Sequence, residues 1–397
     1  MKTGQKKQIL GNTAYTMGGT LLMNGVLQIA IYPLLNRVMG ADELGTVLYI
    51  MGLVAIVCPS VGQALNNSRL VVRRDHQVAN GDYNRLVLFF AIISSGIAII
   101  ASGSSVRGSF TIVMTALLLI ITSYRYYGDV EYRLSLNYRH FFVYYLLMSV
   151  GYLVGFVIYW LGGSWFFIFL TGELAALIFV GIKGSIFRDF WEKSDCFSIA
   201  RYRGFLLIIS YLITNSTLNM DRLVLKHMVG NTAVTQYYVV SLIGKTLVLL
   251  VAPINTIVIS YLTKREKTIN RKEFGKAAGA GLLVAFLFFI ACQIATPIFI
   301  KLFYGDLYDS VRSLITVVNL TQILAVLSAF LFILVLTFTE EKWQLSLQVL
   351  HLVLMTALVI SFTFKGEILG YSYGALIANV VRVILVLILG FVKVRRK

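Results

Sequence analysis

Twelve long apolar segments, separated by short polar stretches, constrain this sequence more than any other feature. A helix needs about 20 apolar residues to cross the hydrocarbon core of a bilayer. The pattern therefore predicts an all-α, polytopic membrane protein with about twelve transmembrane helices. The segments run approximately over residues 10–36, 44–66, 86–102, 108–127, 140–161, 165–184, 204–220, 236–261, 277–300, 313–338, 344–364 and 369–392.

The composition leaves little chain for anything else. Of the 397 residues, 58% are hydrophobic and 13% are charged, whereas a soluble domain has roughly 45–50% apolar and about 25% charged residues. Twelve spans leave loops that average about ten residues, which is too short for a soluble domain. This disfavours an ATPase domain, a receptor domain or an enzyme with a large external catalytic loop.

The excess of basic residues indicates an orientation in the membrane. The net charge is +17, which in a soluble protein would suggest nucleic acid as a partner. In a membrane protein Lys and Arg hold loops on the cytoplasmic side. The termini and loops on the N-terminal side of the predicted membrane hold 26 Lys and Arg residues, and the loops on the other side hold 7. Two more cations lie inside spans. We therefore expect both termini in the cytoplasm, an even number of spans and no nucleic-acid partner.

Cysteine and histidine show no metal or disulfide pattern. The three cysteines, Cys58, Cys196 and Cys292, lie far apart, and no two of the four histidines are three or four residues apart. A zinc site or a disulfide framework needs paired spacings. We predict no metal site, no cofactor and no catalytic residues.

The chain also divides into two halves. The longest charged cytoplasmic loop, 185–203, falls near the midpoint, and we expect part of it to lie at the membrane surface as an amphipathic stretch. It would link an N-terminal half of six helices, 1–184, to a C-terminal half, 204–397. A faint repeat aligns Gly40 with Gly230, and duplicated halves are common in secondary transporters.

Two segments resemble a known family. Residues 12–52 resemble the opening of the polysaccharide transporters, the Wzx-type flippases for O-antigen and capsule repeat units, in Pro33, Leu34, Leu35, Arg37, Gly40, Glu43, Gly45 and Tyr49. Residues 214–254 look similar to the start of the family's second half. The matching positions there are Asp221, Arg222, Tyr237 or Tyr238, and Lys245.

The resemblance covers the whole chain and implies a structure and a function. The two halves would form a V around a central cavity and move by alternating access. The substrate would be an undecaprenyl-diphosphate-linked oligosaccharide, flipped across the bacterial cytoplasmic membrane for O-antigen, capsule or exopolysaccharide synthesis. Membrane lipids and the polysaccharide polymerase machinery would be its further partners.

Lys245 is the first candidate for substrate binding. It lies about nine residues into the eighth predicted span, near the midplane of the bilayer. Inserting a cation at that depth costs roughly 2.5–3.5 kcal/mol of free energy. It should therefore face a wet cavity and contact the diphosphate. The alternative is a structural ion pair with Glu173 of the sixth span.

Other charged residues carry two interpretations each. Arg382 of the last span would bind substrate or pair with another helix. Glu173 would couple transport to protons or neutralise Arg382 or Lys245. Asp221 and Arg222 would form an outer gate or simply end the seventh span, and the same alternatives hold for Arg37.

Polar residues mark the first and seventh predicted spans. Asn24 and Gln28 are four residues apart and share one helix face, and Asn215 and Asn219 lie in the seventh span. Polar faces inside a bilayer point at other helices or at water. We expect these four residues to line a hydrophilic lumen for the glycan, with interhelical hydrogen bonding as the alternative.

Two other functions compete with a flippase. A cation-coupled multidrug or metabolite antiporter of the same superfamily would need an intramembrane acid. The drug exporters usually carry an Asp in the first span as their cation site, but segment 10–36 contains no acidic residue. Glu173 is then the acid left inside a span for this role. A membrane glycan polymerase or acyltransferase would need catalytic groups on accessible loops, and the outer acids show no such spacing.

Overall fold

The computed structural model describes residues 3–263, 270–336, 339 and 341–393, and within these ranges the chain is helical without a strand. The prediction of an all-α protein is thereby confirmed. The α-helices are α1 (Thr3–Gly25), α2 (Tyr32–Cys58), α3 (Ala64–Val72), α4 (Asn80–Ser102), α5 (Ser109–Gly128), α6 (Val130–Leu134), α7 (Tyr138–Trp160), α8 (Phe166–Lys183), α9 (Phe197–Leu218), α10 (Met220–Met228), α11 (Asn231–Thr263), α12 (Arg271–Phe303), α13 (Tyr308–Val311), α14 (Ile315–Leu336) and α15 (Glu341–Lys393). Short π-helical turns and 3₁₀-helices join some of them: Val26–Ile31, Pro59–Gln63, Gly103–Ser105, Gly305–Leu307 and Arg312–Leu314.

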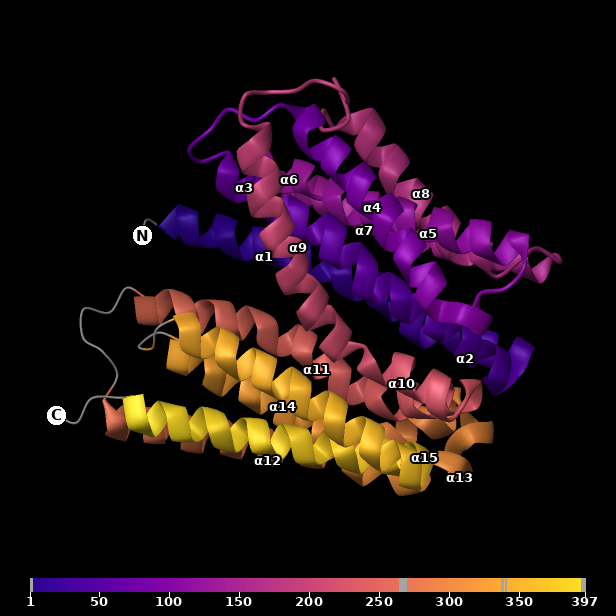
Figure 1. Cartoon of the computed structure of the whole chain (residues 1–397), viewed down its shortest axis with the longest axis vertical. Coiled ribbons are helices and arrows are strands. Elements are labelled where there is room, and N and C mark those ends of the chain that lie inside the picture. Colours follow the sequence, from indigo (N-terminus) through magenta and orange to yellow (C-terminus); the bar gives the residue numbers. More distant parts are fainter. Residues whose placement is uncertain (1–2, 264–269, 337–338, 340, 394–397) are drawn as a thin grey trace. The chain divides into compact units, whose positions relative to one another are not determined.

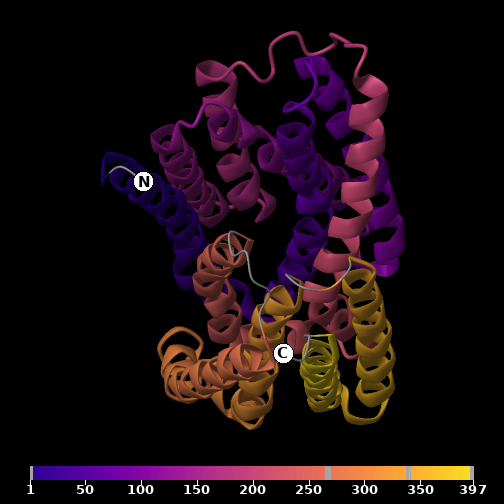
Figure 2. The same ribbon diagram turned by 90° about the vertical axis from the view of Figure 1, so that its left-hand side faces the viewer.

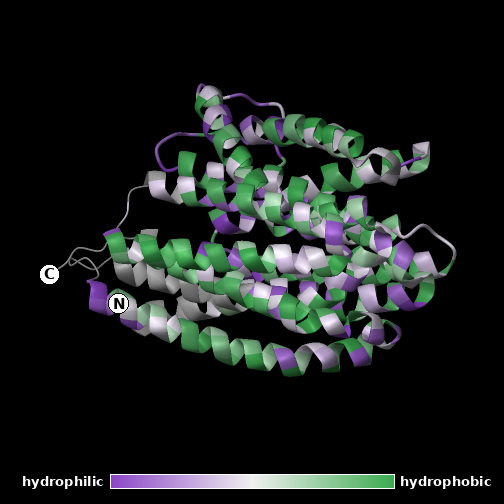
Figure 3. Cartoon of the chain, turned by 60° about the horizontal axis from the view of Figure 1, so that its bottom comes forward, coloured by the Kyte–Doolittle hydropathy of each residue, from purple (hydrophilic) through white to green (hydrophobic). Residues whose placement is uncertain are grey.

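Each predicted span overlaps one of these helices. By length and composition, nine helical stretches of the described residues are able to cross a membrane. Two of them, Ala14–Val72 and Ser346–Lys393, are long enough to hold two predicted spans each. The eighth predicted span lies within α11. The chain is thus a multi-pass membrane protein, and Figure 3 shows hydrophobic residues along most of the length of its helices.

Backbone kinks divide the two long stretches where the sequence predicts loops. Gly40 has φ +79° inside α2, a conformation that glycine adopts without steric cost. In α15 the break falls at Gly366 and Glu367, and Glu367 has φ +49°. Beyond this break the second arm of α15 folds back along the first. The close approach is seen at Gly370, where a Cβ would lie 2.1 Å from the carbonyl oxygen of Phe362. Figure 2 shows these arms side by side.

The described residues pack into two units. The first comprises Met1–Val38 and Ile50–Asn219, and the second comprises Met39–Tyr49 and Met220–Lys397. In the first unit α7 packs against α8 and α1. In the second, α14 packs against α11, α12 and α15 (Figure 1), and Phe274, Leu331 and Val386 belong to its buried core.

The predicted linker is folded onto the first unit. Residues 185–196 form turns, and α9 begins at Phe197. Asn84 donates to the carbonyl oxygen of Ile186 at 2.9 Å, and Asp82 accepts from the backbone N–H of Ser194 at 3.0 Å. α9 then packs against α3. The boundaries 1–184, 185–203 and 204–397 and the cavity between two halves stay predictions.

Candidate functional site

Lys245 and Asp221 form an ion pair in the second unit. The Nζ of Lys245 lies 2.7 Å from Oδ2 of Asp221. The aspartate side chain is 5% exposed, whereas the lysine side chain is 28% exposed. Two predicted site residues are thus brought together, and the lysine is still reachable. The alternative in which Glu173 neutralises Lys245 is wrong, because the partner is an acid predicted to lie at the end of the seventh span.

α10 carries two further cations: Arg222 directly follows Asp221, and Lys226 donates to Oδ1 of Asn231 at the start of α11. Arg222 and Lys226 are one helical turn apart on the same face. The guanidinium carbon of Arg222 is 5.4 Å from the ring centre of Tyr238, and Nζ of Lys226 is 5.9 Å from that of Tyr49. We call Arg222, Lys226, Lys245 and Asp221 the cationic cluster. The formal charges of these four residues sum to +2, and a second carboxylate, that of Asp42, is linked to Lys226 through Asn231.

A tight contact joins α2 to the start of α11. Gly45 lies against the backbone of Asn231, and a Cβ on Gly45 would lie 2.0 Å from the carbonyl oxygen of Asn231. Asn231 donates to Asp42 at 3.0 Å. The turn between α10 and α11 contains Gly230 with φ +134°, and its predicted repeat partner Gly40 also has a positive φ. The faint repeat therefore aligns two glycines that both have a positive φ.

Glu173 lies in a separate, closed network in the first unit. Nε of Arg125 lies 2.7 Å from Oε2 of Glu173, and both side chains are about 5% exposed or less. The hydroxyl of Tyr152 donates to Oε1 at 2.8 Å. The prediction that Glu173 neutralises Arg382 is wrong as well. Arg125 was missed as a partner because it lies near the end of the fourth predicted span, among tyrosines typical of an interface.

Three further acids, which lie just outside the predicted spans, are buried like Glu173. The acidic side chains that are buried in the described residues each have a cation within 4 Å. The pairs are Asp82 with Arg85 at 3.9 Å, Asp129 with Arg133 at 3.3 Å, Glu173 with Arg125 at 2.7 Å and Asp221 with Lys245 at 2.7 Å.

The polar residues of the first and seventh spans are largely hydrogen-bonded to helices. Asn24 donates to the carbonyl oxygen of Thr20 at 2.8 Å, and Asn219 donates to that of Asn215 at 3.0 Å, each within its own helix. Asn215 donates to Ser60 at 3.0 Å and so joins two helical segments. Gln28 lies half-buried in the π-helical turn. A lumen lined by these residues stays a prediction.

Two predicted arginines lie outside these networks. Arg37 is exposed on α2, and Arg382 is half-buried on the second arm of α15. Within the described part of the chain neither has a carboxylate within 4 Å. Their roles at a gate and in substrate binding stay predictions.

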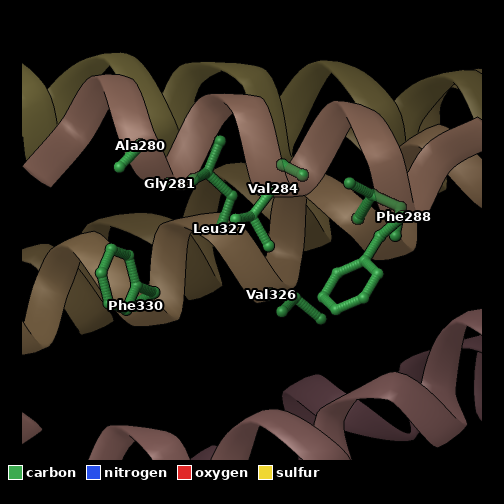
Figure 4. A pocket seen from close by; sticks show the side chains of 9 residues that line it. Ala280, Gly281, Val284, Phe288, Val326, Leu327 and Phe330 are labelled. Carbon is green, nitrogen blue, oxygen red and sulfur yellow. The ribbon is translucent and has the colours of Figure 1, made fainter.

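An apolar cavity of about 280 Å³ lies between α12 and α14. Its lining comes from residues between Ala280 and Phe288 and between Ile323 and Phe330. Figure 4 shows carbon side chains at this cavity. It offers no side-chain group for a charged head group. Among the described residues, no group of three His, Cys, Asp or Glu is placed to hold a metal ion.

The fold is that of known transporters. No family model and no curated protein matches the chain. Solved structures do match: a MATE transporter in a straight conformation, with a TM-score of 0.60, 17% identity and coverage of 98% of this chain and 96% of that one. A MOP superfamily transporter from Pyrococcus furiosus matches at 0.59, with 18% identity and coverage of 98% and 94%. A multidrug resistance MATE family transporter in an outward-facing conformation matches at 0.58, with 16% identity and coverage of 98% and 96%.

Proposed function

We propose that this chain flips undecaprenyl-diphosphate-linked oligosaccharide repeat units across the bacterial cytoplasmic membrane for the synthesis of a surface polysaccharide. The observation that carries the proposal is the cationic cluster with its net charge of +2. O-antigen, capsule and exopolysaccharide are the products to which such repeat units lead. The polysaccharide polymerase machinery is the partner that would consume the exported unit.

The charge of the cluster suits the head group of this substrate. A diphosphate carries negative charge on several oxygens, and an arginine guanidinium binds two of them at once. Lys245 is more exposed than its partner Asp221, so an anionic ligand can reach the ammonium group while the carboxylate stays covered. In a site poor in water such contacts are stronger than in bulk solvent.

A solved structure with the same fold supports the use of site charge to infer the substrate. In the transporter from Pyrococcus furiosus, a reverse polarity of the binding pocket suggests a different function for that protein. Function on a shared fold is set by the groups of the site. In this chain, the cations of the cluster are the groups on which we base the choice of an anionic substrate.

The second candidate is a cation-coupled multidrug antiporter, which the multidrug resistance transporters among the neighbours favour. A coupling cation needs a carboxylate that is free to bind it. The buried carboxylates of the described residues are already paired with Arg or Lys, which counts against this candidate. Drug efflux driven by an ion gradient and abolished in a Glu173→Gln variant would support it.

The proposed transport cycle is alternating access. The solved neighbours include outward-facing and inward-facing conformations of a transporter with this fold. We propose that both termini lie in the cytoplasm, that cations hold the diphosphate and that the lipid tail stays in the bilayer. Arg382, Asn24 and Gln28 would contribute to the glycan path, and Arg37 would act at its outer end.

The test uses a strain in which the gene is deleted. Lipid-linked repeat units should accumulate on the inner leaflet, and the wild-type chain should restore export. Lys245→Ala should lower the export rate at least about tenfold, because a hydrogen bond to a charged group contributes about 1.5–3 kcal/mol. Lys245→Arg should keep most of the rate. Each variant is compared at equal membrane abundance.

The double variant Asp221→Asn, Lys245→Ala separates binding from pairing. It removes both charges, so no uncompensated acid is left behind. If Lys245 binds substrate, the double variant stays as inactive as Lys245→Ala. Full export by the double variant would show that the lysine only balances Asp221, and normal export by Lys245→Ala would exclude it from the site.

A further inference from the structure

A polar cavity of about 480 Å³ lies in the first unit, between the end of α3, the start of α4, and α6. Its lining includes Arg69, Arg73, His76, Asn80 and Glu131. Both arginines belong to the side that the distribution of charge predicts to be cytoplasmic. The cationic cluster belongs to the second unit, so this cavity is a separate feature.

Arg69 is a buried cation without a counter-ion. It is 5% exposed, and within the described residues no carboxylate lies within 4 Å of it. Its guanidinium donates to two neutral oxygens, the hydroxyl of Tyr127 and, at 2.6 Å, Oδ1 of Asn80. Its buried Nε has no hydrogen-bond partner among the described residues. Burial of a charge is costly unless the charge is paired and hydrogen-bonded.

The neutral partners fix the guanidinium without cancelling its charge. Tyr127 and Asn80 hold it from two sides, so the side chain loses little further freedom when an anion binds. Arg73 lies one helical turn further on and is exposed to solvent at the same cavity. The arrangement is one buried, oriented arginine with a second, accessible arginine beside it.

The one acid of the lining is already engaged. Glu131 accepts from the backbone N–H of Ser185 at 3.1 Å. It does not form an ion pair with Arg69, which has no carboxylate within 4 Å in the described chain. Two guanidinium groups against one carboxylate leave the cavity with a net positive charge when His76 is neutral.

We propose that this cavity binds a phosphate group, with Arg69 as the fixed anchor and Arg73 as the outer contact. Phosphate is the anion whose geometry matches the paired donors of arginine. The group is carried either by an anionic lipid of the inner leaflet or by free phosphate in the cytoplasm. The site does not rest on the proposed flippase function, because none of its residues belongs to the cationic cluster.

The test measures thermal stabilisation of the purified full-length protein. A ligand that binds the folded state raises its stability in proportion to occupancy. One arm adds inorganic phosphate to protein in detergent. The other compares nanodiscs of phosphatidylglycerol with nanodiscs of phosphatidylcholine. Stabilisation in the first arm identifies free phosphate as the ligand, and stabilisation by phosphatidylglycerol over phosphatidylcholine identifies an anionic lipid.

Three variants decide whether the cavity is responsible. Arg69→Gln removes the charge and keeps polar atoms, and it should weaken binding at least about tenfold. Arg73→Gln is exposed and should fold normally, with binding about two- to fivefold weaker. Arg74→Gln is the matched control, because Arg74 is an exposed neighbour outside the lining.

The proposal is supported if either arm shows binding that Arg73→Gln weakens and Arg74→Gln leaves unchanged. It is overturned if neither arm stabilises the wild-type protein. It is equally overturned if Arg74→Gln weakens binding as much as Arg73→Gln, because the effect would then come from surface charge in general.

Discussion

Two ion pairs of equal length differ in what surrounds them. Lys245 with Asp221 and Arg125 with Glu173 both measure 2.7 Å. The second pair is closed to solvent on both sides, whereas the lysine of the first is 28% exposed. Exposure of one charge allows exchange of its partner for a ligand. The same distance therefore accompanies a closed pair in the first unit, whereas for the exposed lysine of the second unit we propose a binding role.

The closed pair predicts a stability effect. Glu173→Leu leaves Arg125 buried without its carboxylate, and breaking a buried pair from one side costs about 3–5 kcal/mol. Unfolding of the purified protein in mixed micelles measures the loss. Glu43→Leu is a control, because Glu43 is exposed and its loss should change the free energy of unfolding by less than about 0.5 kcal/mol.

Removing both charges should recover most of that loss. In Arg125→Met, Glu173→Leu no buried charge is left unpaired, and apolar replacement of a buried pair is often neutral. If the double variant is as unstable as Glu173→Leu, the pair is not the cause. A single variant as stable as the wild type would contradict the structural role directly.

The sequence was informative about which residues carry charge in the membrane and less so about their partners. Depth along a predicted span singles out Lys245 from the sequence alone. Its partner Asp221 is also a predicted site residue, but as the end of a span. Pairing depends on which helices are neighbours and on their rotation, and neither is encoded in the hydropathy of a single segment.

At the scale of elements, α7 and α8 show how small residues bring helices together. Gly151 and Gly155 are four residues apart on α7, and a Cβ on Gly151 would lie 2.6 Å from the Cα of Gly172 on α8. Thr171 donates to the carbonyl oxygen of Gly151 at 2.7 Å. Small residues at this spacing allow backbones to approach within a membrane.

This contact predicts that substitution of glycine by alanine has very different effects at different positions. Gly155→Ala would place a Cβ 2.5 Å from the carbonyl oxygen of Phe167, so we expect a loss of about 1–3 kcal/mol from overpacking. Gly96→Ala is the matched control on α4, where a Cβ meets nothing within 4 Å. It should be neutral or stabilise by up to about 1 kcal/mol.

The thermal unfolding midpoint of each purified variant in detergent makes this comparison. The account requires a lower midpoint for Gly155→Ala and an unchanged or higher one for Gly96→Ala. Equal midpoints for the two variants would mean that α7 and α8 do not pack through these glycines.

The extent of the elements follows well from hydropathy, because a membrane span is a local property of about 20 residues. The kinks at Gly40 and at Gly366 both fall in predicted loops. The course of residues 185–196 was less accessible. Its turns depend on hydrogen bonds to Asp82 and Asn84, which lie about a hundred residues earlier.

At the scale of the whole molecule, the comparisons show a shared fold, and function on a shared fold is set by the groups of the site. Identities of 14–18% to transporters of one superfamily establish a shared architecture. They do not choose between lipid-linked sugars and drugs. That choice depends on charge, and the described residues present accessible cations and paired buried acids.

The most direct measurement is transport by the purified chain in vesicles. A labelled undecaprenyl-diphosphate oligosaccharide is placed in both leaflets, and a membrane-impermeant glycosidase reports the fraction that becomes accessible. Vesicles with the protein should expose nearly all of the label, and vesicles without it only the outer-leaflet share. Accessibility that stays at the outer-leaflet share, together with ion-driven efflux of an organic cation from the same vesicles, would contradict the account.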